Sequence, residues 1–435
     1  MDLSKEDRNE LLFVGFNQDQ GCFACGTDTG FRIYNVDPFK ETFRREFSQG
    51  GIGRVEMLFR CNILALVGGG KHPRFPPHKV MIWDDHQNMC IGELAFRSDV
   101  RNVKLRRDRV VVVLQNKLYV YNFADLNLLD HIETVDNPLG LCALCPDPFN
   151  TVLACPSLQQ GHVRVELYDV RQQTLIPAHE TALAALTLNS TGRRLATASE
   201  KGTLIRVFDT ATGDLLQELR RGADKAVIYC IAYVLACGVG ARLPALHCLL
   251  PPSLHRFSPD TKWLACTSDK GTVHIFKLND AVVEGGKADA AGAPSAASST
   301  AAAAVAAAPT TVKGATPPKT GASPAASEGG SASAPAASTA GGAGGGAEAG
   351  AAATEEAPGN ARSSFAFMRG LLPKYFSSEW SHAQFKLEET RALVAFGKGH
   401  TIVVVTAEGS FYVADFSAGA TAERTTYSQF VKPSS

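Results

Sequence analysis

The sequence predicts an all-β protein: a seven-bladed β-propeller of the WD-repeat type, with a long disordered loop in its sixth blade. Three observations predict this fold class. One strand-like motif recurs seven times, tight polar turns precede several of its copies, and no long amphipathic helix interrupts the pattern. The chain has 435 residues, of which 45% are hydrophobic, so it can bury a sizeable core.

The recurring motif is a short run of alternating apolar residues that ends in an aromatic residue, often followed by Asp or Asn. Such alternation is typical of a half-buried strand. The early copies lie roughly 40–45 residues apart, the spacing of a four-stranded propeller blade. The copies are FRIYNV (31–36), VMIWDD (80–85), LYVYNF (118–123), VELYDV (165–170), IRVFDT (205–210), VHIFKL (273–278) and, more loosely, FYVADF (411–416).

Short polar turns are expected between the second and third strands of a blade, because Gly, Asp and Ser tolerate the backbone of tight hairpins. We also expect the two ends of the chain to share one blade and so close the ring, with LLFVGF (11–16) and TTYSQFVK (425–432) as partners. The turn sequences are GTDTG (26–30), SEKGT (199–203), SDKGT (268–272) and AEGS (407–410).

Two segments break the repeat. Residues 281–361 are almost all Ala, Gly, Ser, Pro and Thr, which cannot bury enough apolar area to order a chain, so we expect a disordered excursion. Residues 233–256 interrupt blade six, either as a real loop or as an untrimmed intron. The chain therefore divides into blades one to six (1–280), the loop (281–361), and the end of blade six, blade seven and ring closure (362–435).

Composition limits the class of protein. The 43 basic and 43 acidic residues give no net charge, which argues against a nucleic-acid binder. The N-terminal MDLSKEDRNE lacks the apolar stretch of a signal peptide, and eleven cysteines suit reduced thiols, so we expect a cytoplasmic protein. The apolar run 227–241 is shorter than the ~20 residues of a membrane-spanning helix.

The sequence offers little to support enzyme chemistry. Two CxxC patterns, Cys22 with Cys25 and Cys142 with Cys145, lie in apolar strand-like runs and are expected to be core residues rather than zinc ligands. We find no motif that pairs a nucleophile with a base and no Gly-rich phosphate loop leading into a helix. We therefore expect that the protein is not an enzyme and that it binds no cofactor and no metal.

The stretch LQELRRGADKA (217–227) places two arginines side by side at the end of a strand-like run. Neighbouring side chains of a strand point to opposite faces, so Arg220 and Arg221 can serve two pockets. Guanidinium, ammonium and hydroxyl groups together suit a phosphorylated ligand, although a solvated strand end is the alternative. The expected pocket walls are His179, Thr197, Ser199 and Lys201 on one side, and Lys225, Thr267, Ser268 and Lys270 on the other.

The LRRG stretch resembles the L/F-R-R-G motif of the PROPPIN family, the phosphoinositide-binding seven-bladed propellers of autophagy that are called WIPI proteins in animals. The resemblance covers nearly all of the chain except 233–256 and 281–361. The run LPKYFSS points to one branch of the family. The matching stretches are LVGGGKHPRFPPHKVMIWDD (66–85), VKLRRDRVVVVL (103–114), AHETALAALTLNSTGRRLATASEKGTLIRVFDT (178–210) and LPKYFSSEWS (372–381).

This resemblance implies binding of phosphatidylinositol 3-phosphate and phosphatidylinositol 3,5-bisphosphate, one headgroup on each side of the motif. The motif opens with Leu219 where many members have Phe, an apolar exchange that should matter little. The insertion 233–256 interrupts the strand that leads into one wall of the second pocket. We therefore expect it to weaken that pocket if it distorts blade six.

The resemblance also implies that the blade-six loop inserts into the bilayer. Its C-terminal end, 363–380, alternates apolar side chains with Arg369 and Lys374, a pattern suited to a membrane interface. We expect 365–372 to insert and 375–380 to pack on the propeller. The inserting residues are Phe365, Phe367, Met368, Leu371 and Leu372.

A protein partner is implied as well. FNQDQ (16–20) is by composition a polar turn, but the resemblance makes Asn17 and Asp19 candidates for contacting the autophagy lipid-transfer protein that the family recruits, together with Pro73 and Arg74. The implied protein is a monomer that lies peripherally on phagophore (preautophagosomal) and endosomal membranes. The competing hypothesis is a generic WD-repeat scaffold that binds proteins only.

Overall fold

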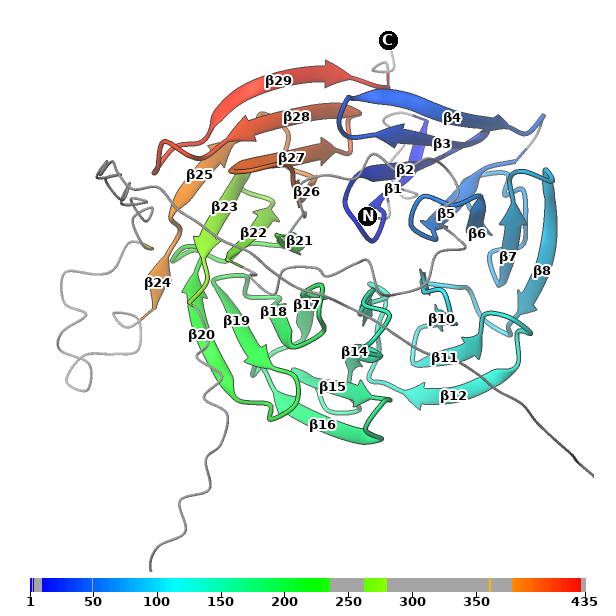
Figure 1. The fold of residues 1–435 in the computed structure, drawn as a ribbon, viewed down its shortest axis with the longest axis horizontal. Helices are drawn as coiled ribbons and strands as arrows, with labels where there is room; N and C mark the ends of the chain where they lie inside the picture. The colour runs from blue at the N-terminus through cyan, green and yellow to red at the C-terminus, as the bar shows by residue number, and fades with distance from the viewer. Residues whose placement is uncertain are drawn as a thin grey trace, which may run out of the picture. The chain divides into compact units, whose positions relative to one another are not determined.

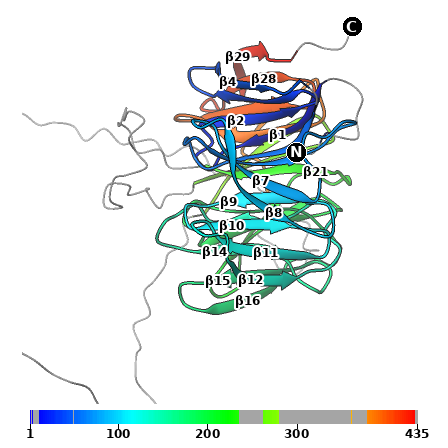
Figure 2. The ribbon, with the colours of Figure 1, turned by 90° about the vertical axis from the view of Figure 1, so that its right-hand side faces the viewer.

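The computed structural model describes residues 1, 3, 10–48, 50–234, 262–279, 360 and 378–431, which form seven β-sheets arranged in a ring (Figure 1). Figure 2 shows the ring from its side. The sheets follow one another around the ring in chain order, and each holds four strands, with one extra strand on the fifth. The seven-bladed β-propeller predicted from the repeat is confirmed.

The first four sheets are built from consecutive strands. The first contains β1 (Leu11–Phe16), β2 (Cys22–Thr27), β3 (Gly30–Asn35) and β4 (Lys40–Glu46). The second contains β5 (Ile52–Met57), β6 (Ile63–Gly68), β7 (Lys79–Asp84) and β8 (Met89–Ala95). The third contains β9 (Asn102–Leu105), β10 (Arg109–Val113), β11 (Lys117–Asn122) and β12 (Leu128–Glu133). The fourth contains β13 (Ala143–Leu144), β14 (Val152–Pro156), β15 (His162–Leu167) and β16 (Gln172–Pro177).

The remaining sheets include the one departure from consecutive order. The fifth contains β17 (Leu183–Leu188), β18 (Arg194–Ser199), β19 (Leu204–Asp209), β20 (Leu215–Arg220) and the short edge strand β24 (Glu379–Trp380), which runs parallel to β20. The sixth contains β21 (Ile228–Tyr233), β22 (Trp263–Ser268), β23 (Thr272–Lys277) and β25 (Ala383–Lys386). The seventh contains β26 (Ala392–Phe396), β27 (Thr401–Thr406), β28 (Ser410–Asp415) and β29 (Glu423–Gln429).

The repeat motif corresponds to one position in the architecture. All seven copies fall on the third strand of a sheet, although VELYDV overlaps β15 only in its first half. The four predicted polar turns join second to third strands, as expected. The second strand of a sheet, such as β2 or β18, is covered by the neighbouring sheets and is buried along almost its whole length. An outer strand such as β4 instead alternates exposed and half-buried residues. A continuous apolar run therefore marks the inner strands and an alternating pattern the rim.

Side chains that alternate along a strand enter different interfaces between sheets. On β18, Ala196 and Ala198 pack in the cluster shared with the sixth sheet, while Leu195 packs in the cluster shared with the fourth. Leu219 of β20 faces the sixth sheet in the same way. This alternation fixes which neighbouring sheet each polar side chain of the fifth sheet faces.

The predicted closure of the ring by a shared blade is wrong. In the structure β29 pairs with β28 as the outer strand of the seventh sheet, and β1 pairs with β2 as the inner strand of the first. The first and seventh sheets meet through side chains instead, with the ring of Phe411 stacked at 4.1 Å on Phe39 and at 6.1 Å on Phe23. Aromatic packing can close the ring because each terminal segment already completes a four-stranded sheet.

The tip of the β1–β2 hairpin, which the sequence suggests is a simple turn, joins five sheets. Gln18 donates to the carbonyl oxygens of Met57 (2.6 Å) and Leu105 (3.0 Å), at the ends of β5 and β9. Gln20 donates to the Tyr233 carbonyl (3.2 Å) and accepts from the Phe396 amide (2.9 Å), at the ends of β21 and β26. These side chains tie the first sheet to the second, third, sixth and seventh.

Replacing both glutamines by alanine (Gln18→Ala/Gln20→Ala) should lower the free energy of unfolding by about 2–4 kcal/mol, because several buried backbone groups lose their partners. Urea denaturation measures the change. The matched control is Gln173→Ala, which removes an exposed glutamine from β16 and should cost less than ~0.5 kcal/mol. Equal stability of the two variants would contradict the proposed role of the hairpin tip.

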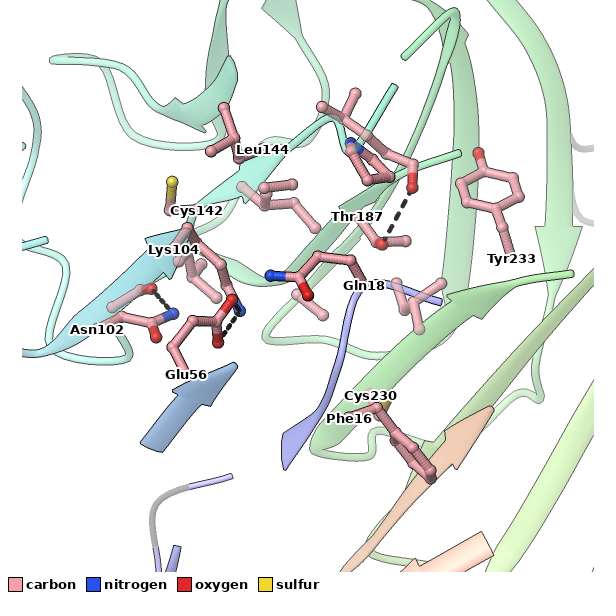
Figure 3. Close-up of a pocket in the computed structure, with 18 of the residues that line it drawn as sticks. Phe16, Gln18, Glu56, Asn102, Lys104, Cys142, Leu144, Thr187, Cys230 and Tyr233 are labelled. Carbon is pink, nitrogen blue, oxygen red and sulfur yellow. Dashed lines mark hydrogen bonds and ion pairs between the residues drawn. The ribbon is translucent and has the colours of Figure 1, made fainter. Parts of the chain in front are cut away.

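The inner strands enclose a cavity of about 340 Å³ in the middle of the ring (Figure 3). Gln18, Glu56 and Lys104 are among the residues that line this cavity, and Lys104 forms an ion pair with Glu56 at 3.2 Å. Burial raises the pKa of Glu56, while the neighbouring Lys104 counteracts that rise. Neither Arg220 nor Arg221 lines this cavity, so the arginine motif serves a different part of the molecule.

The sixth sheet forms in spite of the segment that interrupts it. β21 and β22 pair in antiparallel register, with Ile231 opposite Cys266, on either side of 235–261. The strand continues to Tyr233, slightly past the predicted start of the insertion. Residues 235–256 lie outside the described residues, as does 281–361 except for Asn360. The long segment leaves after the third strand of the sixth sheet, as predicted, but the chain adds β24 to the fifth sheet before β25 completes the sixth.

Candidate anion-binding pockets beside the arginine pair

The two arginines are buried at the outer end of the fifth sheet. Arg220 is the last residue of β20 and is 8% exposed, and Arg221 follows it at 6% exposure. Since Leu219 faces the sixth sheet, strand alternation turns Arg220 toward the fourth-sheet side. Arg221 lies on the sixth-sheet side, where its charge lowers the pKa of His274. A guanidinium group therefore lies on each side of the fifth sheet, and a guanidinium is a group suited to binding anions.

The Arg220 side holds a group of buried polar residues. His179 Nε2 lies 2.9 Å from Thr197 Oγ1, and both side chains are buried. Beside them, Arg206 donates from Nη1 to the Ala178 carbonyl (2.7 Å) and from Nε to Glu218 (3.0 Å). The structure therefore brings His179 and Thr197 together, as the sequence predicts. Arg206 was missed, although it lies directly opposite Thr197 on β19, in the middle of a repeat motif.

His179 is a neutral hydrogen-bonding group near neutral pH. Burial, reinforced by the nearby charge of Arg206, lowers the pKa of His179 to about 4. The neutral imidazole can exchange hydrogen bonds with a phosphate without adding a permanent charge to the pocket. A bound anion would favour the protonated form and add a further charge-assisted contact.

Ser199 and Lys201 belong to the turn between β18 and β19. Ser199 is buried, and exposed Lys201 forms an ion pair with Glu180 at 3.6 Å. Gly202 in this turn has φ of +63°, and an added Cβ would lie 1.8 Å from the Ala226 carbonyl oxygen. The turn thus requires glycine, and it holds Lys201 next to the loop after Arg221, where the Ala226 amide donates to the Lys201 carbonyl.

The Arg221 side is built from the sixth sheet and the loop 222–227. Arg221 donates from Nε to the Gly202 carbonyl (2.7 Å) and from Nη2 to the Asp224 carbonyl, so it also braces that loop. Ser268 is buried at the end of β22, while Lys225 and Lys270 are exposed. His274 was missed by the sequence analysis, although it stands in the repeat copy VHIFKL.

His274 resembles His179 in its environment. It is 7% exposed on β23, and its Nδ1 lies 3.3 Å from Ser381 Oγ. Burial first, and then the charge of Arg221, lower the pKa of His274 to about 4. Each arginine of the motif is therefore accompanied by one buried, neutral histidine.

Thr267 does not belong with these residues, which corrects its predicted place in the second pocket. Its hydroxyl donates to the Ala392 carbonyl of β26 at 2.6 Å, so it faces the seventh sheet. The two turn sequences align Ser199 with Ser268, which aligns Thr197 with Cys266 and leaves Thr267 one position out of step. A shift of one residue along a strand reverses the face of the sheet.

The four predicted partner-binding residues differ in accessibility. Asn17 is 5% exposed, and its amide donates to the Phe59 carbonyl (3.1 Å) and accepts from the Cys22 amide (3.0 Å). Asp19 is half-buried and paired with Arg60 at 2.9 Å. Pro73 and Arg74 are exposed in the loop between β6 and β7. Asn17 therefore serves the hairpin itself, and the blade-two loop is the accessible surface.

The predicted membrane-inserting residues Phe365, Phe367, Met368, Leu371 and Leu372 lie outside the described residues. Of the segment expected to pack on the propeller, the structure describes Ser378, Glu379 and Trp380, and the last two form β24. In the described part of the chain, no helix is long and apolar enough to cross a bilayer.

The cysteine patterns belong to the core. Cys22 and Cys25 lie on β2, Cys142 and Cys145 flank β13, and all four are buried. Burial raises the pKa of Cys142 and of Cys145 to about 12, which disfavours the thiolate that a metal needs. Among residues 10–48, 50–234, 262–279 and 378–431 no cluster of His, Cys, Asp and Glu could hold a metal ion.

The fold and the site together define a WD-type β-propeller with groups of buried polar side chains beside two buried arginines on its rim. Residues 10–238 match the family model described as PROPPIN, and residues 251–277 match that of the WD domain, G-beta repeat. The PROPPIN match spans more than half of the chain. This chain belongs to the PROPPIN family.

Individual relatives agree with this assignment. Autophagy-related protein 18e of Arabidopsis thaliana is 34% identical over 408 residues, which cover 92% of this chain and 82% of that protein. SVP1-like protein 2 of Neurospora crassa is 41% identical over 292 residues, covering 66% of this chain and 61% of that protein. The PROPPIN family model and the Arabidopsis relative place the chain among autophagy-related β-propellers.

Solved structures support the fold. Kluyveromyces lactis Hsv2 aligns with a TM-score of 0.60 at 22% identity, covering 97% of this chain and 99% of that one. A second structure, a complex of KlAtg21 with the coiled-coil of AgAtg16, aligns with a TM-score of 0.61 at 20% identity and the same coverage.

Proposed function

We propose that this protein is a phosphoinositide effector of autophagy. It binds phosphatidylinositol 3-phosphate and phosphatidylinositol 3,5-bisphosphate through two pockets, one on each side of the LRRG motif. The observation that carries the proposal is that two sequence-adjacent arginines, Arg220 and Arg221, are both buried and lie beside separate groups of buried polar side chains.

Each pocket combines three kinds of group that recognise phosphate. An arginine supplies a planar fork of donors, a buried histidine and serine or threonine supply directed hydrogen bonds, and an exposed lysine supplies mobile positive charge. On the first side these are Arg220, His179 with Thr197 and Ser199, and Lys201. On the second side they are Arg221, His274 with Ser268, and Lys225 and Lys270.

Two headgroup sites and an inserting segment act together through avidity. Individually weak contacts raise the effective affinity by orders of magnitude when all of them engage one bilayer. The segment 363–377, with its aromatic and aliphatic side chains on both sides of Arg369 and Lys374, is the proposed insertion element. The protein would then lie peripherally on phagophore and endosomal membranes, while remaining cytoplasmic.

Recruitment of an autophagy lipid-transfer protein completes the proposal. The exposed loop that carries Pro73 and Arg74 supports it, because the Arg74 guanidinium lies over the rings of Phe47 (5.2 Å) and Phe75 (5.8 Å) and so presents a rigid, charged surface. Asp19 on the hairpin tip, half-buried and paired with Arg60, is a second proposed contact. Asn17 is not included, because its side chain is buried.

Liposome flotation tests the lipid-binding function. The full chain should float with vesicles that contain phosphatidylinositol 3-phosphate, and the Arg220→Ala/Arg221→Ala variant should lose at least tenfold in affinity, since each lost arginine removes about 1.5–3 kcal/mol of charge-assisted contact.

A variant that removes two exposed arginines, Arg97→Ala/Arg193→Ala, is the control for the loss of charge and should float like the native chain. Indifference of the native chain to the lipid would favour a scaffold that binds proteins only. Equal flotation of the native chain and the motif variant would show that the arginines do not bind the headgroup.

A further inference from the structure

A cluster of polar side chains lies at the outer edge of the fifth sheet, where the long excursion leaves the propeller and returns to it. Gln217 and Glu218 come from β20, Ser378 and Glu379 from the returning chain, and Asn360 from the last fifth of the excursion. These five residues are called the clasp below. Gln217, Ser378 and Glu379 are each at most 8% exposed.

Asn360 is held on the propeller by hydrogen bonds on both sides of its amide. It accepts from the Lys277 amide and donates to the Lys277 carbonyl, both at 2.6 Å, as a neighbouring strand residue would. Asn360 also donates to Glu379 Oε2 at 3.0 Å, and Gln217 donates to the same oxygen at 2.6 Å. A buried carboxylate that accepts two donors is a strong and directional junction.

The clasp contacts the chain at three described points: where the excursion departs, at Asn360 and where the chain returns. The chain departs at Asn279, whose amide donates to Gln217 (3.1 Å), and returns to the same place at Asn360. The next segment, 361–377, begins at Asn360 and ends at Ser378 and Glu379, which are also in the clasp. A chain of roughly 17 residues held at both ends extends at most ~30 Å from its anchor, against more than ~150 Å for the roughly 98 residues of an undivided excursion.

The clasp is joined to the Arg220 pocket by a continuous set of hydrogen bonds. Glu218 accepts from Ser378 at 2.9 Å with one oxygen and from Arg206 at 3.0 Å with the other. Arg206 in turn contacts the carbonyl of Ala178, the residue before His179. In addition, β24 pairs with β20 so that Trp380 is opposite Arg220 itself. Figure 1 shows β24 alongside β20.

We propose that the clasp is a positioning site that holds both ends of the amphipathic segment 361–377 beside the Arg220 pocket. The inference rests on the proposed function and adds a requirement to it. The headgroup pocket and the apolar segment work on one membrane because a short tether keeps the local concentration of the segment high. The pocket binds a soluble headgroup without the clasp, whereas tight membrane binding needs it.

The test is the isosteric substitution Asn360→Asp in the full chain. It keeps the acceptor for the Lys277 amide, removes the donors to Glu379 and to the Lys277 carbonyl, and places a second carboxylate beside the first. The exchange Asn360→Asp/Glu379→Gln removes the repulsion between the two carboxylates and allows the new amide at position 379 to donate to the new carboxylate at position 360, although the donor to the Lys277 carbonyl stays lost. Asn88→Asp, in an exposed turn of the second sheet, makes the same change of charge elsewhere.

Two binding measurements separate positioning from headgroup recognition. Calorimetry with soluble inositol 1,3-bisphosphate should give affinities within about twofold for the native chain and all three variants. Flotation with phosphatidylinositol 3-phosphate vesicles should weaken about tenfold for Asn360→Asp, recover in the double exchange and stay native for Asn88→Asp. Amide exchange at Glu379 and Trp380 should quicken only in Asn360→Asp, because β24 loses its support.

Native flotation of Asn360→Asp would overturn the inference, and so would a loss of soluble headgroup binding in that variant, since the clasp would then be part of the pocket. Absence of headgroup binding by the native chain is a different result. It would overturn the proposed function, and the inference with it.

Discussion

Replacing Arg220 alone by alanine is expected to lower the number of soluble headgroups bound per chain from about two to about one. The reason is that Arg220 and Arg221 lie on different sides of the fifth sheet, each with its own buried histidine. Arg221→Ala should have the same effect on the other pocket. Flotation of either variant should weaken by about tenfold or more, because one of two linked contacts with the bilayer is lost.

Calorimetry with inositol 1,3-bisphosphate gives the number of sites directly. Arginine-to-lysine variants are the matched controls, because lysine keeps the charge but lacks the planar fork, and they should retain both sites at reduced affinity. If either alanine variant lost both sites at once, the arginines would share a single pocket. Unchanged stoichiometry in both would show that neither arginine contacts the headgroup.

The second large effect is a loss of stability in mild acid that comes from the two buried histidines. In the folded chain the pKa of His179 and of His274 is about 4, whereas an unfolded histidine titrates near 6.5. Between these values the unfolded chain binds protons that the folded chain does not. The free energy of unfolding therefore rises with pH in this window: the contribution is fully present above pH 6.5 and is lost as pH falls toward 4, by about 3 kcal/mol per histidine.

Urea denaturation at pH 7 and pH 4.5 measures this effect, with buried Trp263 as a fluorescent probe. The variant His179→Gln/His274→Gln cannot titrate at these positions and should show a flatter dependence on pH. His162→Gln, which removes a half-buried histidine from β15, should keep the native dependence. Parallel curves for the native chain and the double variant would mean that the histidines titrate normally in the folded protein.

Much of the fold was predictable because propeller blades are local in sequence. The alternation of FRIYNV and its copies specifies a strand with one face toward each neighbouring sheet. Turns such as SEKGT specify the hairpin that joins the second strand to the third. The closure of the ring was not predictable in this way. It depends on side-chain packing of Phe39 and Phe23 against Phe411, residues far apart in sequence whose stacking no local pattern reports.

The candidate site likewise contains residues that could be predicted from local sequence and residues that could not. Arg220 and Arg221 could be assigned to opposite faces from strand alternation alone, and His179 and Thr197 could be placed near them. Arg206 and His274 were missed because a polar residue in a strand looks the same in sequence whether it faces water or a buried pocket.

The amino-acid sequence by itself determined the repeat, the turns between the second and third strands and the motif that marks the site, since these depend on neighbours in the chain. Only the tertiary structure decided which side chains meet. It turned Thr267 toward the seventh sheet, buried Asn17, and brought Asn360 and Glu379 together beside β20. The physical reason is that contacts between sheets depend on register and on packing across long separations, which no single stretch of sequence contains.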